Sequence, residues 1–406
     1  MNLLMFLHTN YPYDRRVERE AESLINEGYN VYLLCRGYGK ENIHGINVKR
    51  VDTPLYYFYS FYGFLTNFSQ SFWLKHINEA VNEIKPNAIH IHDLSYAYPA
   101  FVVAEEKNIP VILDLHDNII FQLTEKLWKD WSIKLNPLSY WIYNIKRWKK
   151  HQQRLIKKAF HVISVNDESK KYYIKETGIS PEGISVVMNV DDPDYLNSFP
   201  IDNDVIEKYK NRFVVSYIGS MGIHRGIDVM IKALPIIKKK LPEIFFLVVG
   251  PKDKKYVAKL KKLINSLSLT NHVEFKGYIH FGKVPSYIKA SQIGIIPHKK
   301  GGLGDKALPN KLFQYMALGI PVITSNAAPL KRIINETKAG LIFEADNHKD
   351  LAEKVIYISE NGSIAQKMGD QGIYWTKKRY NWKIESRKLI QIYKKIESLE
   401  KEEKWI

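Results

Sequence analysis

The sequence has one cysteine and no long apolar run, and both absences narrow the class of protein. The single thiol, Cys35, excludes an intramolecular disulfide and a structural zinc site, which is typical of a reducing compartment. No window approaches the roughly 20 uninterrupted apolar residues that a membrane-spanning helix requires. The start of the chain, residues 1–6, lacks the basic segment of a signal peptide. We therefore expect a cytoplasmic protein, either soluble or peripheral on the inner face of the cell membrane.

Acidic residues are also in short supply. The 406 residues include 60 Lys and Arg against 43 Asp and Glu, a net charge of +17. Such a chain favours anionic partners: nucleic acid, an anionic membrane surface or phosphorylated small molecules. Its 45% hydrophobic and 25% charged residues are ordinary for a globular protein and exclude disordered or collagen-like classes. The length predicts two domains, or at most three.

The excess positive charge gathers in residues 119–158. Lys and Arg are numerous there, whereas Glu125 and Asp130 are the only acidic residues, and the segment holds half of the chain's 8 tryptophans. Asn136 and Pro137 are typical of a helix start. Helical spacing then places Trp141 and Trp148 on one side, with Lys and Arg on the others. The pattern predicts contact with the headgroup layer of an anionic membrane, and a packed helix with a solvated basic face is the alternative.

Short apolar runs alternate with helical patterns in two series, separated by a polar stretch at residues 191–211. The predicted strands of the first series are 3–7, 31–35, 88–92, 111–115, 162–165 and 185–188; those of the second are 213–218, 244–249, 273–275, 293–296 and 321–324. Continuous apolar strands between helices predict parallel sheets covered on both faces. The expected fold is α/β, with two Rossmann-like doubly wound domains, 1–195 and 196–382, facing a central cleft. A final helix, 383–406, is expected to pack back on the first domain.

Familiar cofactor motifs are missing. There is no Walker A sequence, and no Gly-x-Gly-x-x-Gly follows the first strand, which argues against P-loop and standard NAD sites. His90 and His92 share one face of a strand, but no third ligand stands at a matching spacing. The acidic stretch 191–194 fits a metal-binding Asp-x-Asp less well than a linker turn. We therefore expect no metal.

Two glycine-containing loops are candidates for binding phosphate. The first follows the strand at 213–218 and contains Gly219, Gly222 and Arg225. Glycines let the backbone approach a phosphate, a following helix points N–H groups at it, and Arg adds charged donors, although glycines there could simply form the turn. The second runs through residues 301–305 to a helix that starts at Lys311, with Gln314 on nearly the same face. There Lys311 could hold a diphosphate while Gln314 reaches a ribose.

Taken together, these motifs resemble the retaining glycosyltransferases of family 4, the group 1 glycosyltransferases of GT-B fold. The resemblance covers nearly the whole chain. The segments that carry it are 14–24, 89–93, 113–117, 189–191, 219–226, 275–278, 290–297 and 311–323, of which the last is the most diagnostic.

The resemblance implies transfer of a sugar from a nucleotide-diphosphate sugar, with retention, to a glycan or lipid-linked acceptor, as in cell-surface polysaccharide or glycolipid biosynthesis. It assigns a sugar-contacting catalytic role to His116, facing the donor from the first domain, and we expect Asp117 to orient it; a histidine bonded to backbone is the alternative. The implied donor-binding residues are Gly219, Ser220, Gly222, Arg225, Gly250, Tyr278, Gly304, Asp305, Asn310, Lys311 and Gln314. The implied acceptor-side residues are Asn10, Arg16 and His92.

The chain departs from the family pattern at three positions. The family's Glu-x7-Glu pair falls on Lys306 and Gln314, and an Arg that many members place after the first loop glycine is Ser220 here. A Gln carbonyl can still accept a hydrogen bond from a ribose hydroxyl. Asp305 or backbone amides would then have to replace the acid at Lys306.

Two other functions fit parts of the sequence. A sugar-nucleotide epimerase of the same layout would share the phosphate site but needs acid and base carboxylates near it. A non-catalytic protein that binds nucleic acid or membranes would explain the charge. The basic residues, however, lie on a tryptophan-bearing helix without a recognised nucleic-acid-binding module, so we expect no nucleic-acid partner.

Overall fold

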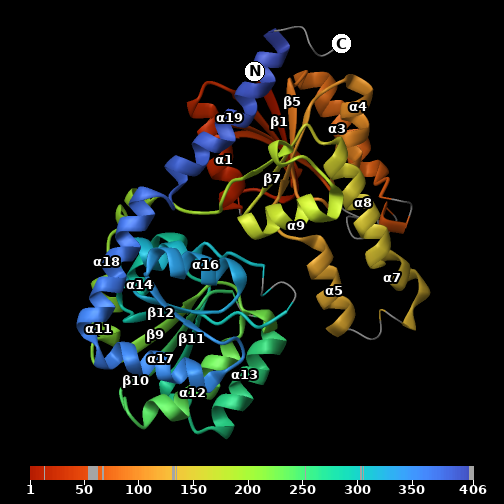
Figure 1. The fold of residues 1–406 in the computed structure, drawn as a ribbon. Coiled ribbons are helices and arrows are strands. Elements are labelled where there is room, and N and C mark those ends of the chain that lie inside the picture. Colours follow the sequence, from red (N-terminus) through yellow and green to blue (C-terminus); the bar gives the residue numbers. More distant parts are fainter. Residues whose placement is uncertain are drawn as a thin grey trace. The chain divides into compact units, whose positions relative to one another are not determined.

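The computed structural model describes residues 1–12, 14–53, 63–65, 68–129, 133, 135–251, 253–301, 304 and 306–401. The chain forms two compact units (Figure 1): unit 1 is Met1–Met188 with Glu385–Ile406, and unit 2 is Asn189–Ile384. The sequence predicted two domains with boundaries at 195/196 and 382/383, whereas the two units divide at 188/189 and 384/385. Among the described residues, no helix is both long and apolar enough to cross a bilayer.

Unit 1 is built on a sheet with the strand order β3-β4-β2-β1-β5-β6-β7-β8. Neighbouring strands pair in parallel, except that β3 pairs antiparallel with β4. The bounds are β1 (Asn2–Asn10), β2 (Asn30–Arg36), β3 (Lys40–Ile43), β4 (Ile46–Val51), β5 (Ala88–His92), β6 (Val111–Leu115), β7 (His161–Ser164) and β8 (Ile184–Val186). The sequence analysis missed the β3–β4 hairpin, because β3 is polar and largely exposed and so lacks an apolar run.

The helices of unit 1 are α1 (Arg15–Asn26), α3 (Ser71–Ile84), α4 (Tyr98–Lys107), α5 (Ile119–Lys129), α7 (Pro137–Ile142), α8 (Ile145–Lys158), α9 (Asp167–Thr177) and α19 (Trp382–Lys401). α19 returns to unit 1 from the end of the chain (Figure 1) and buries Leu389, Ile392, Tyr393 and Ile396. These side chains form the face of α19 that packs in unit 1, as expected for the final helix.

The predicted long helix from Pro137 is wrong in one respect. It is two helices, because the Asn144 side chain accepts a hydrogen bond from the Arg147 amide and starts α8 anew. Trp148 is only 2% exposed, packs on Phe68 and donates its indole N–H to the Ile142 carbonyl at 2.6 Å. Of the two interpretations that the sequence left open, the packed helix with a solvated basic face therefore holds for α8, whose Trp148 belongs to the core, whereas Trp141 on α7 is 51% exposed.

Unit 2 has an all-parallel sheet among its described pairs, with the order β11-β10-β9-β12-β13-β14. Its strands are β9 (Phe213–Ile218), β10 (Ile244–Val249), β11 (Val273–Gly277), β12 (Ile293–Ile296), β13 (Val322–Ser325) and β14 (Gly340–Phe343). Its helices are α10 (Pro193–Asn197), α11 (Asn203–Tyr209), α12 (Ile227–Lys238), α13 (Lys254–Ser266), α14 (Val284–Lys289), α15 (Lys311–Ala317), α16 (Ala328–Thr337), α17 (His348–Glu360) and α18 (Gly362–Lys378). The apolar strands β9, β10, β12 and β13 form one core with α12, α13 and α17. The loops after β9 and β12 carry the predicted phosphate-binding residues.

Candidate functional site

The loop after β9 approaches Lys311 closely because it starts with a glycine. Gly219 has φ +135°, and a Cβ there would lie 2.6 Å from the Lys311 Nζ. Gly250, which follows β10, has φ +143°, and a Cβ there would lie 2.1 Å from the Gly219 carbonyl oxygen. The Tyr217 hydroxyl donates to the Ser220 carbonyl at 2.8 Å and fixes the loop, while the Ser220 side chain is exposed. Glycine is thus required sterically at both positions.

The Lys311 amine is buried at the start of α15. Lys311 is 8% exposed, and its Nζ lies 3.6 Å from the centre of the Tyr217 ring, a cation–π contact. No carboxylate pairs with it within the described part of the chain. Burial, followed by the nearby Arg225 guanidinium, holds the pKa of Lys311 well below its ordinary value. A bound anion would supply the negative charge that stabilises the protonated form of Lys311.

Arg225 lies at the end of a short 3-10 turn, Ile223–Arg225, directly before α12. Its Nη1 donates to the Nε2 of His298 at 3.1 Å. His298 is fully buried, and burial, with Arg225 and Lys311 next, keeps its pKa well below the ordinary value. The imidazole is therefore neutral and can accept. None of the described side chains caps the N-terminus of α12, whose amides remain suited to an anion.

Gln314 and Asn310 converge on Asp191. The Gln314 Nε2 and the Asn310 Nδ2 each donate to the Asp191 Oδ2 at 2.7 Å. This fixes the Gln314 side chain and leaves its carbonyl oxygen as the acceptor that the sequence analysis expected to meet a ribose. Asp192 caps α10 by accepting a hydrogen bond from the Asp194 amide. The acidic stretch 191–194, for which the sequence favoured a linker turn, therefore contains the start of a short helix.

The remaining predicted donor-binding residues differ in how exposed they are. Gly304 is buried, and a Cβ there would lie 2.1 Å from the Lys299 carbonyl oxygen. Gly222 is half-buried, close to the His224 ring. Tyr278 follows β11 and is 78% exposed. Asp305 lies outside the described residues. The structure therefore brings Gly219, Gly250, Arg225 and Lys311 together as one cationic loop cluster.

In unit 1, His116 follows the end of β6 and bonds to Asp114. Its Nε2 lies 2.9 Å from the Asp114 Oδ2 and 3.1 Å from the Nδ1 of His92. Burial alone would lower the pKa of His116, but Asp114 and then Asp93 outweigh it and raise the pKa to about 10. The expectation that Asp117 orients His116 is wrong, since Asp117 is exposed and accepts from Gln122 at 3.0 Å. Asp114 has that role.

The three predicted acceptor-side residues divide between surface and interior. Asn10, at the end of β1, is exposed. The Arg16 side chain is 2% exposed and forks onto both Asp114 oxygens, at 2.9 and 3.0 Å, with a third bond to the Val187 carbonyl. The His92 side chain is fully buried. Arg16 and His92 thus belong to a buried network, which an acceptor cannot reach, and the sequence-based assignment of both is wrong.

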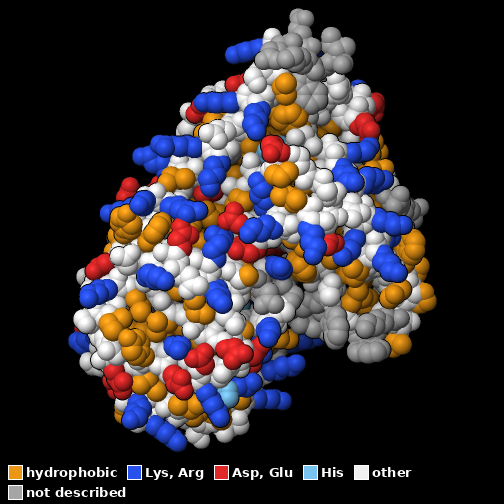
Figure 2. All heavy atoms as spheres, viewed as in Figure 1, with side chains coloured by type: hydrophobic (Ala, Val, Ile, Leu, Met, Phe, Trp, Pro, Cys, Tyr) orange, Lys and Arg blue, Asp and Glu red, His pale blue; other side chains and the backbone are white. Residues whose placement is uncertain are grey.

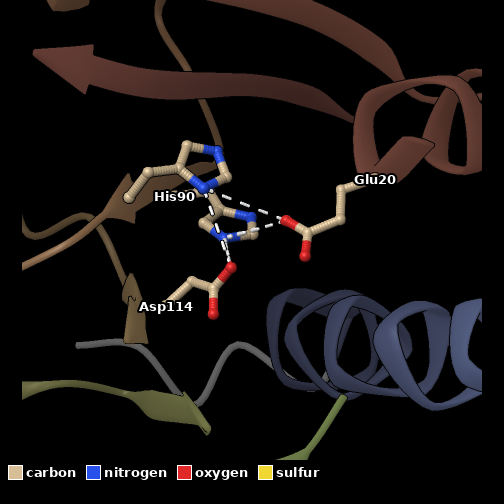
Figure 3. A group of neighbouring side chains, drawn as sticks. Glu20, His90 and Asp114 are labelled. Atoms are coloured by element: carbon tan, nitrogen blue, oxygen red, sulfur yellow. Dashed lines mark ion pairs between the residues drawn. The ribbon is translucent and has the colours of Figure 1, made fainter. Parts of the chain in front are cut away.

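Figure 3 shows the centre of this network, where Glu20 of α1 points toward His90 of β5 and Asp114 of β6. The possible ligand atoms of Glu20, His90, His92 and Asp114 all lie within 4.8 Å of one another, a spacing compatible with a metal ion. However, Arg16 holds both Asp114 oxygens and lies 3.0 Å from Glu20. Burial raises the pKa of Glu20 to about 8 against the pull of Arg16. An ion would have to displace a guanidinium, so these residues fit a charge-balanced network better than a metal site.

Two family models match consecutive parts of the chain. The model described as Glycosyltransferase Family 4 matches residues 14–195, and the model described as Glycosyl transferases group 1 matches residues 198–375. The chain belongs to the group 1 glycosyltransferases. The two matches meet close to the boundary between the units, so each unit corresponds to one of the family's two halves.

Relatives of this group 1 glycosyltransferase family are distant. An uncharacterized glycosyltransferase of Methanocaldococcus jannaschii is 26% identical over 243 residues, 60% of this chain and 59% of the relative. A GDP-mannose-dependent phosphatidylinositol monomannoside mannosyltransferase of Mycobacterium tuberculosis is 24% identical over 167 residues, 41% of this chain and 43% of the relative. The matched stretches are therefore less than two thirds of either relative's length.

Solved structures match almost the entire chain. A glycosyltransferase from Rickettsia africae has a TM-score of 0.74 at 18% identity, covering 97% of this chain and 98% of the other. Sucrose-phosphate synthase from Thermosynechococcus elongatus has a TM-score of 0.78 at 15% identity, with 98% and 99% covered. Anabaena HepE in complex with UDP has a TM-score of 0.73 at 14% identity, with 97% and 100% covered. The predicted GT-B fold is confirmed.

Sequence analysis of this family member missed Glu20, Asp114 and Tyr393. Tyr393 reaches the network from α19, where its hydroxyl lies 2.6 Å from the Nδ1 of His90. Asp114 did give a signal, since a carboxylate inside the apolar run Val111–Leu115 must find a buried partner. Nothing in the spacing, however, indicated that the partner is Arg16, 98 residues away.

Proposed function

We propose that the chain transfers a sugar from a nucleotide-diphosphate sugar to a glycan or lipid-linked acceptor, with retention of configuration and without a metal ion. The cationic loop cluster of unit 2 carries the proposal. Lys311 is buried against Tyr217 without a carboxylate partner among the described residues, next to Arg225 and two sterically required glycines. Such an arrangement suits an anion that brings its own negative charge, and a nucleoside diphosphate is one.

The chemistry asked of these residues is to stabilise charge. As the bond from the anomeric carbon to the diphosphate lengthens, negative charge grows on the leaving oxygen. Preorganised cations and amides stabilise it without reorganisation, which is often the largest single contribution to catalysis. Arg225, held by neutral His298, and Lys311 would supply that stabilisation in the absence of a metal. The sugar-contacting role of His116 stays a prediction from the family resemblance.

The comparisons support the substrate class. Anabaena HepE was solved with UDP-glucose, and a mannosyltransferase relative is named for GDP-mannose and an inositol phospholipid acceptor. We therefore propose a nucleotide-sugar donor and favour a lipid-linked acceptor. Unit 1 would bind that acceptor.

A thermal-shift screen against UDP, GDP and ADP tests donor binding, because a ligand that binds only the native state raises the melting temperature. Arg225→Ala and Lys311→Ala should each weaken binding at least about tenfold, the value of a charged hydrogen bond of about 1.5–3 kcal/mol. Lys262→Ala, on the exposed side of α13, is the matched control and should bind as the wild type does.

Unchanged nucleotide binding in both site variants would contradict the assignment of the loop cluster. The anomeric configuration of the first product, measured by NMR, decides retention. Isomerisation of the nucleotide sugar in the absence of any acceptor would favour the epimerase alternative.

A further inference from the structure

A pocket in unit 1, far from the loop cluster in sequence, is lined by cations. It has a volume of about 360 Å³ and lies along α8, where Lys146, Arg147, Lys150 and Arg154 surround Phe68 and Trp141. No carboxylate is among the described residues that line it. Four cations around one hollow repel one another, so this arrangement favours an anionic occupant.

Arg147 is the centre of the pocket. Its guanidinium lies 4.3 Å from the Phe68 ring centre and 5.2 Å from that of Trp141. Both terminal nitrogens are buried, and neither has a hydrogen-bond partner among the described residues. Leaving charged donors buried and unpaired costs free energy, which an acceptor with several oxygens would recover. A phosphate matches the planar fork of Arg.

The rim next to the pocket is apolar and exposed. α7 and the residues just before it present Leu135 (79% exposed), Leu138 (55%), Tyr140 (50%) and Trp141 (51%). Figure 2 shows hydrophobic side chains beside Lys and Arg on the right-hand edge, where Figure 1 places α7. These exposed apolar side chains would contribute nothing to the binding of a soluble anion. Aromatic and aliphatic side chains beside cations are typical of a segment that lies in the headgroup layer of a membrane.

We propose that the Arg147 pocket binds the phosphate of an anionic phospholipid, with the exposed side chains of α7 inserted among the headgroups. The site differs from a diffuse basic surface in that one desolvated guanidinium makes the specific contact. Lipid binding there goes beyond the proposed sugar transfer, and would hold unit 1 at the surface where a lipid-linked acceptor resides.

Vesicle flotation of the full chain tests the proposal, with vesicles of phosphatidylcholine alone and of phosphatidylcholine mixed with phosphatidylglycerol. The wild type should bind only the mixed vesicles. Arg147→Gln should weaken that binding at least about tenfold, and Arg147→Lys nearly as much, because Lys keeps the charge but loses the fork. Leu138→Ser combined with Trp141→Ser should also weaken it.

The matched control is Lys157→Gln with Lys175→Gln, which removes exposed charges of α8 and α9 outside the pocket and should cost less than either Arg147 change. If Arg147→Lys binds the mixed vesicles as well as the wild type does, or if the control variant loses as much binding as Arg147→Gln, the pocket proposal is wrong and the membrane contact is a diffuse basic surface. Absence of wild-type binding to the mixed vesicles also overturns the proposal. A further result would also overturn it: inorganic phosphate raises the melting temperature of the wild type but not of the Arg147 variants, and the wild type does not bind vesicles. The ligand would then be a soluble phosphate.

Two further measurements distinguish failure of the lipid-pocket proposal from failure of the proposed sugar transfer. Each variant's melting temperature and its thermal shift with UDP report folding and donor binding in unit 2. Vesicle binding with no nucleotide binding would contradict the proposed transferase function alone. The reverse result would contradict the lipid pocket alone.

Discussion

Nucleotide binding should be coupled to the uptake of a proton by Lys311. In the free protein, burial and then the charge of Arg225 lower the pKa of Lys311 well below its ordinary value. A bound diphosphate places negative charge beside the ammonium and raises that pKa again. Between the two pKa values the complex holds one proton more than the free protein. The dissociation constant therefore rises as the pH rises.

The size of the effect follows from linkage. One proton taken up per binding event changes the dissociation constant by up to about tenfold per pH unit, or about 1.4 kcal/mol. The same shift affects stability with a definite sign. Folded Lys311 binds protons less well than unfolded Lys311, so the free energy of unfolding rises as the pH rises from the lowered pKa toward the ordinary value. Arg225 remains charged throughout and contributes no slope.

Calorimetric titration with UDP between about pH 7 and 8.5 measures this, because a terminal phosphate titrates near pH 6 and the uracil ring only at higher pH, so that the ligand does not titrate within the range. Repeating the titration in buffers of different ionisation enthalpy counts the protons directly. Lys311→Gln should bind weakly with a flat pH profile, and Lys311→Arg should bind with a flat profile because Arg does not titrate. A flat wild-type profile would refute the coupling, as would a slope that survives in Lys311→Gln.

Three other outcomes follow from the packing and the site. Gly226→Ala should cost about 2–4 kcal/mol in urea unfolding, since φ is +69° and a Cβ would lie 1.7 Å from the Pro297 carbonyl oxygen; Gly178→Ala, at φ +70° in open space, should cost only about 1–2. Trp148→Ala should cost about 3–5 kcal/mol and the half-exposed Trp141→Ala far less, so equal losses would contradict the placement of Trp148 in the core and of Trp141 at the surface. Sugar transfer should persist in excess EDTA, and a strict metal requirement would point to Glu20, His90, His92 and Asp114 instead.

The sequence predicted most of the fold because apolar strand runs and glycine-marked loops are local signals. The strand bounds of β5, β6, β9, β10 and β12 match the predicted runs residue for residue. The same local logic placed Gly219 and Arg225 at a strand end. It failed where a side chain's environment comes from distant segments. Helical spacing alone could not decide whether Trp148 faces a membrane or the core, whereas in the structure it packs on the Phe68 ring, with ring centres 4.7 Å apart, and is buried.

The charge of His116 could not be predicted from the sequence, because it depends on a residue that lies far away along the chain. Asp114 sits two residues earlier on β6, but its own pKa depends on α1: burial would raise it, and Arg16 and then His116 hold it well below the ordinary value. The ionised Asp114 in turn raises the pKa of His116 to about 10, although burial opposes it. His116 should therefore be an imidazolium at neutral pH, able to donate a hydrogen bond or stabilise negative charge but not to act as a base.

NMR titration of the His116 ring should accordingly show no deprotonation between pH 6 and about 9. The stabilisation that His116 gains from Asp114 is complete below about pH 6.5, its ordinary pKa, and declines above that until it is lost as the pH rises through about 10. The double variant Arg16→Met with Asp114→Asn removes both charges without leaving a guanidinium buried and unpaired. With Asp114 neutral, burial opposes only the remaining effect of Asp93, and the pKa of His116 should fall below its wild-type value of about 10. A His116 ring that titrates near pH 6.5 in the wild-type protein would refute the assignment of its charge to Asp114.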